Sequence, residues 1–293
     1  MIKILLLLIF SQLSAETFFT DCTETAVFLA SPCLSWGVDL NLLYLQASSN
    51  NLNYATEWEN SKWKAHAIRP RYNLGYEFGI STFIQERSSK ANLNYIHYRS
   101  QEGDKTQGFF INGGDLFDHS KGHVAYSLDT GHFDYGVLIN CGNCLKTNFF
   151  GGVGLVRMKQ KIKTDFTNIF FSQKTYASSL FIGIGPEIGF DFSYELLDGF
   201  QIVGKTAGTL FIGRLKNRSS TIHIHHQKTI LPALEGKGGI AYTFKLGDCI
   251  CSFVGGYQIL FYWDAIQSIE NATFQSYKHL SLTGPYCNFE VAF

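Results

Sequence analysis

The sequence is poor in charge and in proline. Lys, Arg, Asp and Glu make up 16% of the 293 residues, against about 25% in an ordinary soluble domain. Only 5 residues are proline, and the formal net charge is zero with no basic block, so the electrostatic footprint of a nucleic-acid-binding protein is missing. Beyond the N-terminus, no segment approaches the roughly 18 uninterrupted apolar residues of a membrane-spanning helix. A helical membrane protein and a nucleic-acid-binding protein are therefore excluded.

Aromatic residues and glycine are abundant. The chain holds 26 Phe, 15 Tyr and 28 Gly. Many aromatics with few charges suit a sheet whose outer face meets lipid. Because open sheet edges cannot be satisfied in hydrocarbon, a membrane protein without spanning helices must be a closed barrel.

The N-terminus resembles an export signal. Lys3 precedes an apolar run over residues 4–10, and Leu13-Ser14-Ala15 forms a small-residue cleavage site. The run is too short to anchor the chain as a helix; a buried N-terminal strand or helix is the alternative. We therefore expect the following organisation: a signal peptide at 1–15, a periplasmic N-terminal segment at 16–35 and a transmembrane β-barrel at 36–293.

Alternation of period two is the main structural signal. In residues 179–195 the even positions are apolar from Leu180 to Phe192, whereas the odd positions other than Phe181 are small or acidic. Similar patterns predict ten strands in all, at 36–46, 71–80, 91–100, 124–140, 147–162, 179–195, 199–214, 233–246, 250–264 and 281–293. The fold class expected is all-β, a single closed antiparallel transmembrane β-barrel of about ten strands.

The connections between these strands alternate in length. Five are predicted to be long loops, at 47–68, 101–123, 163–178, 215–232 and 265–280, and the others are short turns. Long outer loops and short periplasmic turns are typical of outer-membrane barrels. The chain also ends on an amphipathic strand closing at Phe293, which resembles the insertion signal of outer-membrane proteins. Outward aromatics are expected to mark the two membrane interfaces: Trp36, Tyr44, Tyr194, Trp263 and Phe293.

The inward faces of the predicted strands carry ionisable residues. The expected pore-lining set has six acidic and three basic members: Asp39, Arg71, Glu77, Asp134, Glu187, Asp191, Lys205, Lys245, Gln258 and Glu290. Charges inside a membrane-spanning barrel must be hydrated or paired. This set predicts a narrow aqueous path with a mild cation preference. The alternative is an interior packed shut by charge pairs, because small barrels enclose little more than their own side chains.

Seven cysteines in an exported chain indicate disulfides. Six lie before the first strand or on the predicted periplasmic turns and are the disulfide candidates, with their pairing left open: Cys22, Cys33, Cys141, Cys144, Cys249 and Cys251. Cys287 lies mid-strand and is not expected to pair with them.

Metal and catalytic sites are weakly indicated. His223 and His225 could share a transition metal, but a solvated loop is the preferred interpretation. Asp129, His132 and Asp264 near the outer rim are the residues that a protease hypothesis would use, yet no nucleophile elbow or metalloprotease motif accompanies them. The prediction is a non-enzyme without metal or cofactor.

Several segments resemble the Legionella major outer membrane protein family, which has relatives in chlamydia-like bacteria. The resemblance runs over most of the chain after the signal peptide, and each motif is short. The segments are Trp36-Gly37-Val38-Asp39, Tyr72-Asn73-Leu74-Gly75-Tyr76, Leu93-Asn94-Tyr95-Ile96-His97-Tyr98, Phe133-Asp134-Tyr135-Gly136, Gly185-Pro186-Glu187-Ile188-Gly189 and Asn288-Phe289-Glu290. The resemblance implies a pore-forming, often cysteine-bearing outer-membrane protein.

The expected function is therefore passive diffusion of small polar solutes across the outer membrane. The expected partners are outer-membrane lipid and the solutes, with a disulfide-linked or non-covalent oligomer left open and no nucleic acid. One alternative is a structural or adhesive surface protein with a closed barrel. Another is a soluble lipocalin-like barrel, which would carry its apolar residues inward.

Overall fold

The computed structural model describes residues 34–49, 52–59, 62–84, 88–112, 115–141, 144–170, 172–219, 225–271 and 274–293. The predicted signal peptide, most of the predicted N-terminal segment and the candidates Cys22, Cys33 and His223 lie outside these residues. None of the described residues forms a helix long and apolar enough to cross a membrane.

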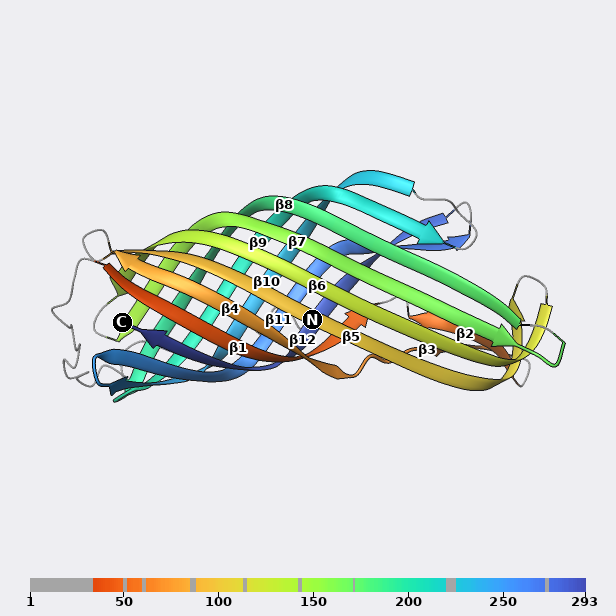
Figure 1. Cartoon of the computed structure of the whole chain (residues 1–293), viewed down its shortest axis with the longest axis horizontal. Helices are drawn as coiled ribbons and strands as arrows, with labels where there is room; N and C mark the ends of the chain where they lie inside the picture. Colours follow the sequence, from red (N-terminus) through yellow and green to blue (C-terminus); the bar gives the residue numbers. More distant parts are fainter. Residues whose placement is uncertain are drawn as a thin grey trace, which may run out of the picture.

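The described chain is built from antiparallel strands (Figure 1). Their bounds are β1 (Leu34–Ser49), β2 (Asn53–Glu59), β3 (Lys62–Ala67), β4 (Tyr72–Ile84), β5 (Ser89–Asn112), β6 (Asp115–Cys141), β7 (Leu145–Thr167), β8 (Ser172–Leu197), β9 (Phe200–Ser219), β10 (His225–Leu246), β11 (Cys249–Asn271) and β12 (Phe274–Ala292). Each of the ten predicted strands overlaps a different one of these along most of its length, so the predicted all-β fold is confirmed.

Ten strands form a ring. The order runs β5-β4-β1-β12-β11-β10-β9-β8-β7-β6, and the pairing of β5 with β6 joins its two ends. The first and last strands of the ring pair along most of β1, for example Asp39 opposite Glu290. The remaining strands, β2 and β3, form a hairpin that pairs with β5 through Glu57 and Phe110.

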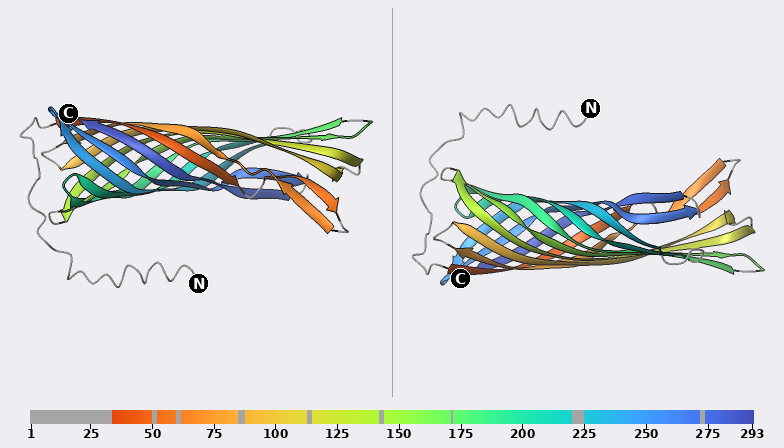
Figure 2. Two further views of the ribbon diagram at one scale, coloured as in Figure 1. Left: turned by 90° about the horizontal axis from the view of Figure 1, so that it is seen from below. Right: turned by 90° about the horizontal axis from the view of Figure 1, so that it is seen from above.

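One end of the ring carries tight turns. The β8–β9 and β10–β11 connections pass through Gly199 (φ 81°) and Gly247 (φ 64°), whose left-handed backbone favours glycine. We call this the short-turn end; the C-terminus lies there (Figure 2). At the opposite, extended end, β5 to β8 project well beyond the ring.

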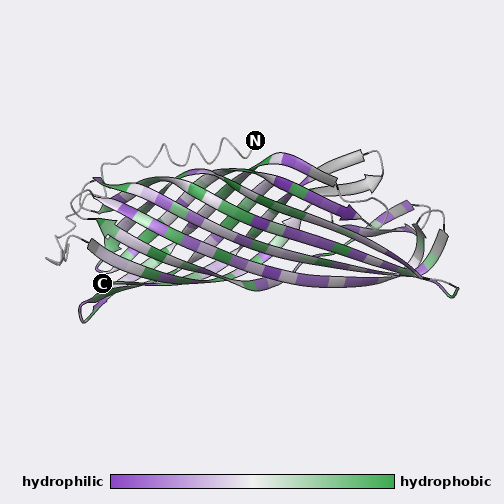
Figure 3. Ribbon diagram, turned by 45° about the horizontal axis from the view of Figure 1, so that its top comes forward, coloured by the Kyte–Doolittle hydropathy of each residue, from purple (hydrophilic) through white to green (hydrophobic). Residues whose placement is uncertain are grey.

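The five connections predicted as long loops are mostly strand, and that part of the prediction is wrong. β5 and β6 pair from Ser89–Val137 out to Asn112–Asp115, through the predicted loop 101–123. Outside the membrane both faces of such a ribbon can be polar, so the alternation that marks a strand is lost although backbone pairing continues. Hydrophobic and hydrophilic residues alternate most clearly along the ribbons of the half near the C-terminus (Figure 3).

The outer surface of the ring carries an apolar band. Large side chains such as Leu74 (74% exposed) and Ile188 (73% exposed) point outward on every wall. The five aromatics predicted for the interfaces are all exposed: Trp36, Tyr44, Tyr194, Trp263 and Phe293. Burying this band in lipid removes a large hydrophobic surface from water. In a soluble barrel the same surface would stay exposed to water.

The hairpin β2–β3 packs on the extended end. The Tyr54 hydroxyl lies 2.6 Å from the Thr106 hydroxyl and donates to Asp104 at 3.2 Å, and burial raises the pKa of the Tyr54 phenol. The His66 and Phe110 rings are in edge contact, with centroids 6.0 Å apart. The hairpin therefore closes over the apolar interior of the β5–β6 extension.

Candidate functional site: a polar cavity beneath an apolar plug

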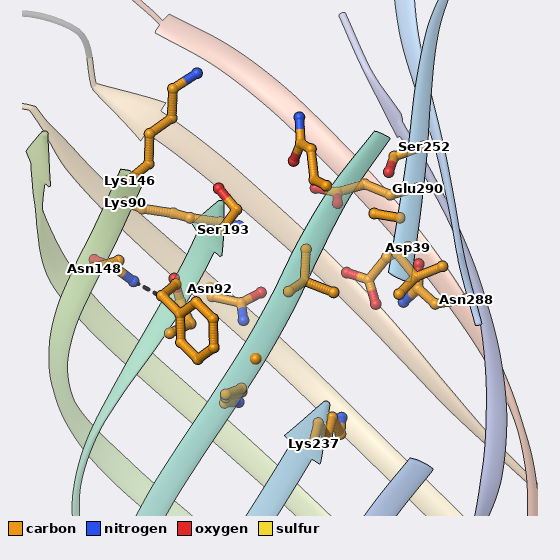
Figure 4. A pocket seen from close by; sticks show the side chains of 18 of the residues that line it. Asp39, Lys90, Asn92, Lys146, Asn148, Ser193, Lys237, Ser252, Asn288 and Glu290 are labelled. Carbon is orange, nitrogen blue, oxygen red and sulfur yellow. Dashed lines mark hydrogen bonds between the residues drawn. The ribbon is translucent and has the colours of Figure 1, made fainter. Parts of the chain in front are cut away.

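The short-turn half of the ring encloses a polar cavity of about 460 Å³. Its acidic lining residues are Asp39, Glu77, Asp134, Asp191 and Glu290, and its basic ones are Lys90, Lys146, Lys205 and Lys237. Figure 4 shows Asp39, Asn288 and Glu290 on one side of the cavity and Lys90, Asn92 and Asn148 on the other. Because the lining residues' outward neighbours Leu40, Phe78 and Phe133 belong to the apolar band, the cavity lies at the depth of the membrane.

A layer of ion pairs bounds the cavity on the side that faces the extended end. Lys237 Nζ donates to the two carboxylate oxygens of Glu77 at 2.6 and 2.8 Å and lies 3.1 Å from Glu235 Oε1. Asn41 Nδ2 donates to Glu77 at 2.9 Å. The layer thus joins β1, β4 and β10 across the lumen, and each of its carboxylates has a cationic partner.

A second pair lies on the other wall. His132 Nδ1 is hydrogen-bonded to Glu187 Oε2, and the Thr209 hydroxyl donates to the same oxygen at 3.0 Å. Below it, Lys205 Nζ lies 5.2 Å from the centroid of the Phe150 ring, a cation–π contact.

Above the charged layer most inward-facing side chains are apolar and buried. We call this cluster the outer plug; its members are Leu43, Leu45, Ile96, Tyr98, Leu128, Val156, Met158, Phe181, Phe211, Leu215, Leu231, Leu260 and Leu282. Leu43, Leu45, Tyr98 and Leu282 are 0% exposed. The cavity is therefore sealed toward the extended end in this conformation.

Six of the ten predicted pore-lining residues line the cavity: Asp39, Glu77, Asp134, Asp191, Lys205 and Glu290. Glu187 and Gln258 also point inward but are buried above it. Arg71 precedes β4 and is exposed, and Lys245 is exposed at the short-turn end of β10. These two lie outside the cavity because the strand ends reach beyond the enclosed space.

The sequence reading missed Lys90, Lys146, Glu235, Lys237 and the outer plug. Glu235 and Lys237 share the inward parity of Lys245, so the alternation already contained that signal. The plug was visible only as runs apolar on both faces, such as Leu42-Leu43-Tyr44-Leu45. Such runs indicate a strand buried on two sides, which a reading based on a polar lumen overlooks.

The residues of the protease hypothesis do not share a site. Asp129 faces outward, where it accepts hydrogen bonds from His97 (2.6 Å) and Tyr95 (3.0 Å). His132, three positions later, faces inward. Asp264 pairs with His279 at 3.6 Å in the outer half of β11.

Among the cysteines, Cys144 is disulfide-bonded, whereas Cys141, Cys249, Cys251 and Cys287 are free. Cys141 and Cys144 therefore do not pair with each other. No group of three or more His, Cys, Asp or Glu side chains able to hold a metal occurs in the described part of the chain.

The outward apolar band, the antiparallel ring and the intramembrane polar cavity define an outer-membrane β-barrel. Residues 30–293 match the family of the Legionella pneumophila major outer membrane protein precursor. The chain belongs to this family, and its location is the bacterial outer membrane. The short-turn end is then periplasmic and the extended end external.

Solved structures are similar in fold. The outer membrane protease OmpT from Escherichia coli superposes with a TM-score of 0.51 at 9% identity, over 88% of this chain and 95% of that one. A major outer membrane protein from Thermus thermophilus gives a TM-score of 0.36 at 9% identity, over 89% and 100%. No curated protein sequence matches.

Proposed function

We propose that this protein is a gated pore for small polar solutes. The observation that supports this proposal is the cavity lined by nine charged side chains, five acidic and four basic, at membrane depth. Ionisable groups inside a membrane are costly and usually mark an aqueous path. The periplasmic half of the barrel supplies that path, and width and charge select the solute by passive diffusion.

The outer plug acts as the gate. Apolar constrictions exclude water and thereby block ions until they widen. Leu43 and Leu282 are fully buried in the plug, so opening requires the outer halves of the strands to separate and admit water between them.

A second candidate function is a surface-structural or adhesive barrel in which the plug never opens. The observation that favours it is the packed interior continuing into the hairpin β2–β3, where Tyr54 and Ile68 are also buried. In that case the barrel only anchors the external β-extension.

Single-channel recording in planar bilayers tests the two. For the wild type we expect rare, brief openings. Leu43→Asn, which hydrates the plug, is expected to raise the open fraction at least tenfold, and Leu43→Ala to do so more weakly. The matched control is Leu42→Asn, because Leu42 is the adjacent outward residue and is 56% exposed; its conductance should equal that of the wild type.

Correct folding is verified for each variant by circular dichroism and heat-dependent gel mobility. A folded Leu43→Asn barrel that conducts no more than the wild type would contradict the gated pore and favour the surface-structural function.

A further inference from the structure

The outward surface of β7 and β9 changes abruptly where the apolar band ends. Leu155, Ile184 and Ile212 lie side by side across β7, β8 and β9, each more than half exposed. The next outward position on β7 is Arg157 and on β9 is Arg214, both opposite Ile182. The border of the band on this wall is therefore cationic.

The charge continues outward as two parallel columns. We call them the basic ladder; it consists of Arg157, Lys159 and Lys161 on β7 and Arg214, Lys216 and Arg218 on β9. Lys159 and Lys216 both lie opposite Leu180, and Lys161 and Arg218 opposite Ser178. Because adjacent strands are about 4.8 Å apart, the columns are separated by about 10 Å with β8 between them.

Few acidic side chains lie close enough to the basic ladder to offset its positive charge. Within the described residues none of its six side chains forms an ion pair. The carboxylate nearest to it in register is Asp129, opposite Arg157, and Asp129 already accepts hydrogen bonds from His97 and Tyr95. One further acid, Asp165, lies beyond Lys163 toward the tip of β7.

Outward cations also occur on flanking strands, at Arg99 on β5 and at Lys228 on β10, which lies opposite Arg214, but the β1–β12 wall differs. On β1 and β12 the first outward residues above the apolar band are the neutral pair Gln46 and Thr283. A general preference for lysine outside the membrane would place cations on both walls. The basic ladder is thus a local surface at the height of the lipid headgroups.

We propose that the basic ladder binds a phosphate-bearing anionic lipid of the outer leaflet. Arginine and lysine side chains pair strongly with phosphate, and cations beside a membrane attract anionic headgroups. Two columns about 10 Å apart suit a headgroup with two separated phosphates better than a single free ion.

The strands below the ladder provide room for the acyl chains. An apolar pocket of about 570 Å³ opens on the same three strands, and its outward lining residues are Phe149, Ile188, Phe190, Thr206 and Gly208. Side chains are smallest at Gly208, where a Cβ would meet nothing within 4 Å. The acyl chains would run over the exposed Leu155, Ile184 and Ile212, and the pocket lies beyond these residues toward the short-turn end.

Native mass spectrometry of the full chain in mixed micelles tests the proposal, with bisphosphorylated lipid A as the probe. The wild type is expected to retain the lipid, and the triple variant Arg157→Gln, Lys159→Gln, Lys216→Gln to bind it at least tenfold more weakly. The matched control neutralises three exposed cations away from the ladder and outside the cavity, Lys62→Gln, Arg71→Gln and Lys245→Gln, and should stay within about twofold of the wild type.

Two further arms identify what is recognised. Dephosphorylated lipid A should bind as weakly to the wild type as to the ladder variant, and inorganic phosphate at equal concentration should displace little lipid. Equal retention by ladder and control variants, equal binding of the dephosphorylated lipid, or complete displacement by inorganic phosphate would each overturn the proposal. The ladder side chains are at least partly exposed, so the variants should fold.

Discussion

At the scale of single residues, Lys237 is held in the lumen by two carboxylates. It bridges Glu77 and Glu235 with contacts of 2.6 and 3.1 Å, and its side chain is only 10% exposed. In a poorly hydrated interior, two carboxylates facing one ammonium are stable only while that ammonium is present.

Lys237→Met should therefore destabilise the barrel strongly. Removing one partner of a buried ion pair costs about 3–5 kcal/mol because uncompensated charge is left behind. Urea unfolding in lipid vesicles, followed by tryptophan fluorescence, measures the loss.

Lys245→Met provides the comparison, since Lys245 is an exposed lysine on the same strand; its unfolding curve should match the wild type. Adding Glu77→Gln and Glu235→Gln to Lys237→Met should recover part of the stability. Equal stability of the two lysine variants would show that the charged layer is hydrated enough to tolerate the loss.

At the scale of elements, the strands are longer than the membrane is thick. β5 and β6 hold 24 and 27 residues, whereas about 9–11 residues are enough to cross a bilayer. The surplus pairs outside, and Phe110 and Phe117 are buried between its layers. The external part is therefore a folded β-structure with its own apolar interior.

Phe110→Ala should loosen this external part while the ring persists. Truncating a buried phenylalanine costs about 3–5 kcal/mol, and Phe110 also contacts His66 of the hairpin. Limited proteolysis of the protein in vesicles should then cut the hairpin β2–β3 faster than in the wild type.

Phe133→Ala changes the same residue type on the lipid-facing surface, where Phe133 is 56% exposed, and should leave the cleavage rate unchanged. If Phe110→Ala is cut no faster than Phe133→Ala, the hairpin does not depend on that core.

At the scale of the whole molecule, the charges of the lumen are asymmetric. Five acids and four lysines line the cavity. Just above it Glu187 pairs with His132 and Glu235 with Lys237. The net charge along the proposed path is negative, which favours cations over anions.

Neutralising facing acids should weaken this preference. Asp39 and Glu290 lie opposite each other on β1 and β12 and both line the cavity. In the Leu43→Asn background, adding Asp39→Asn and Glu290→Gln leaves five acids against four lysines and should move the reversal potential in a salt gradient from the cation side toward zero. An unchanged reversal potential would mean that ions bypass the cavity.

The sequence by itself determined the barrel. Alternation in segments such as 179–195 specifies which face meets lipid, and a one-residue slip would reverse it; the ten strands and the inward position of residues such as Asp39 and Glu187 follow. It could not locate the ends of the strands. Outside the lipid no apolar face is required, so the pairing of β5 with β6 leaves no periodic trace in residues 101–123.

Only the tertiary structure decided what fills the lumen. Whether inward residues contact water or one another depends on the distance across the lumen between facing strands. The sequence of a single strand does not determine that distance. Glu77 on β4 and Lys237 on β10 are 160 residues apart yet share a hydrogen bond. The outer plug and the basic ladder likewise exist only because register places distant residues side by side on one surface of the ring.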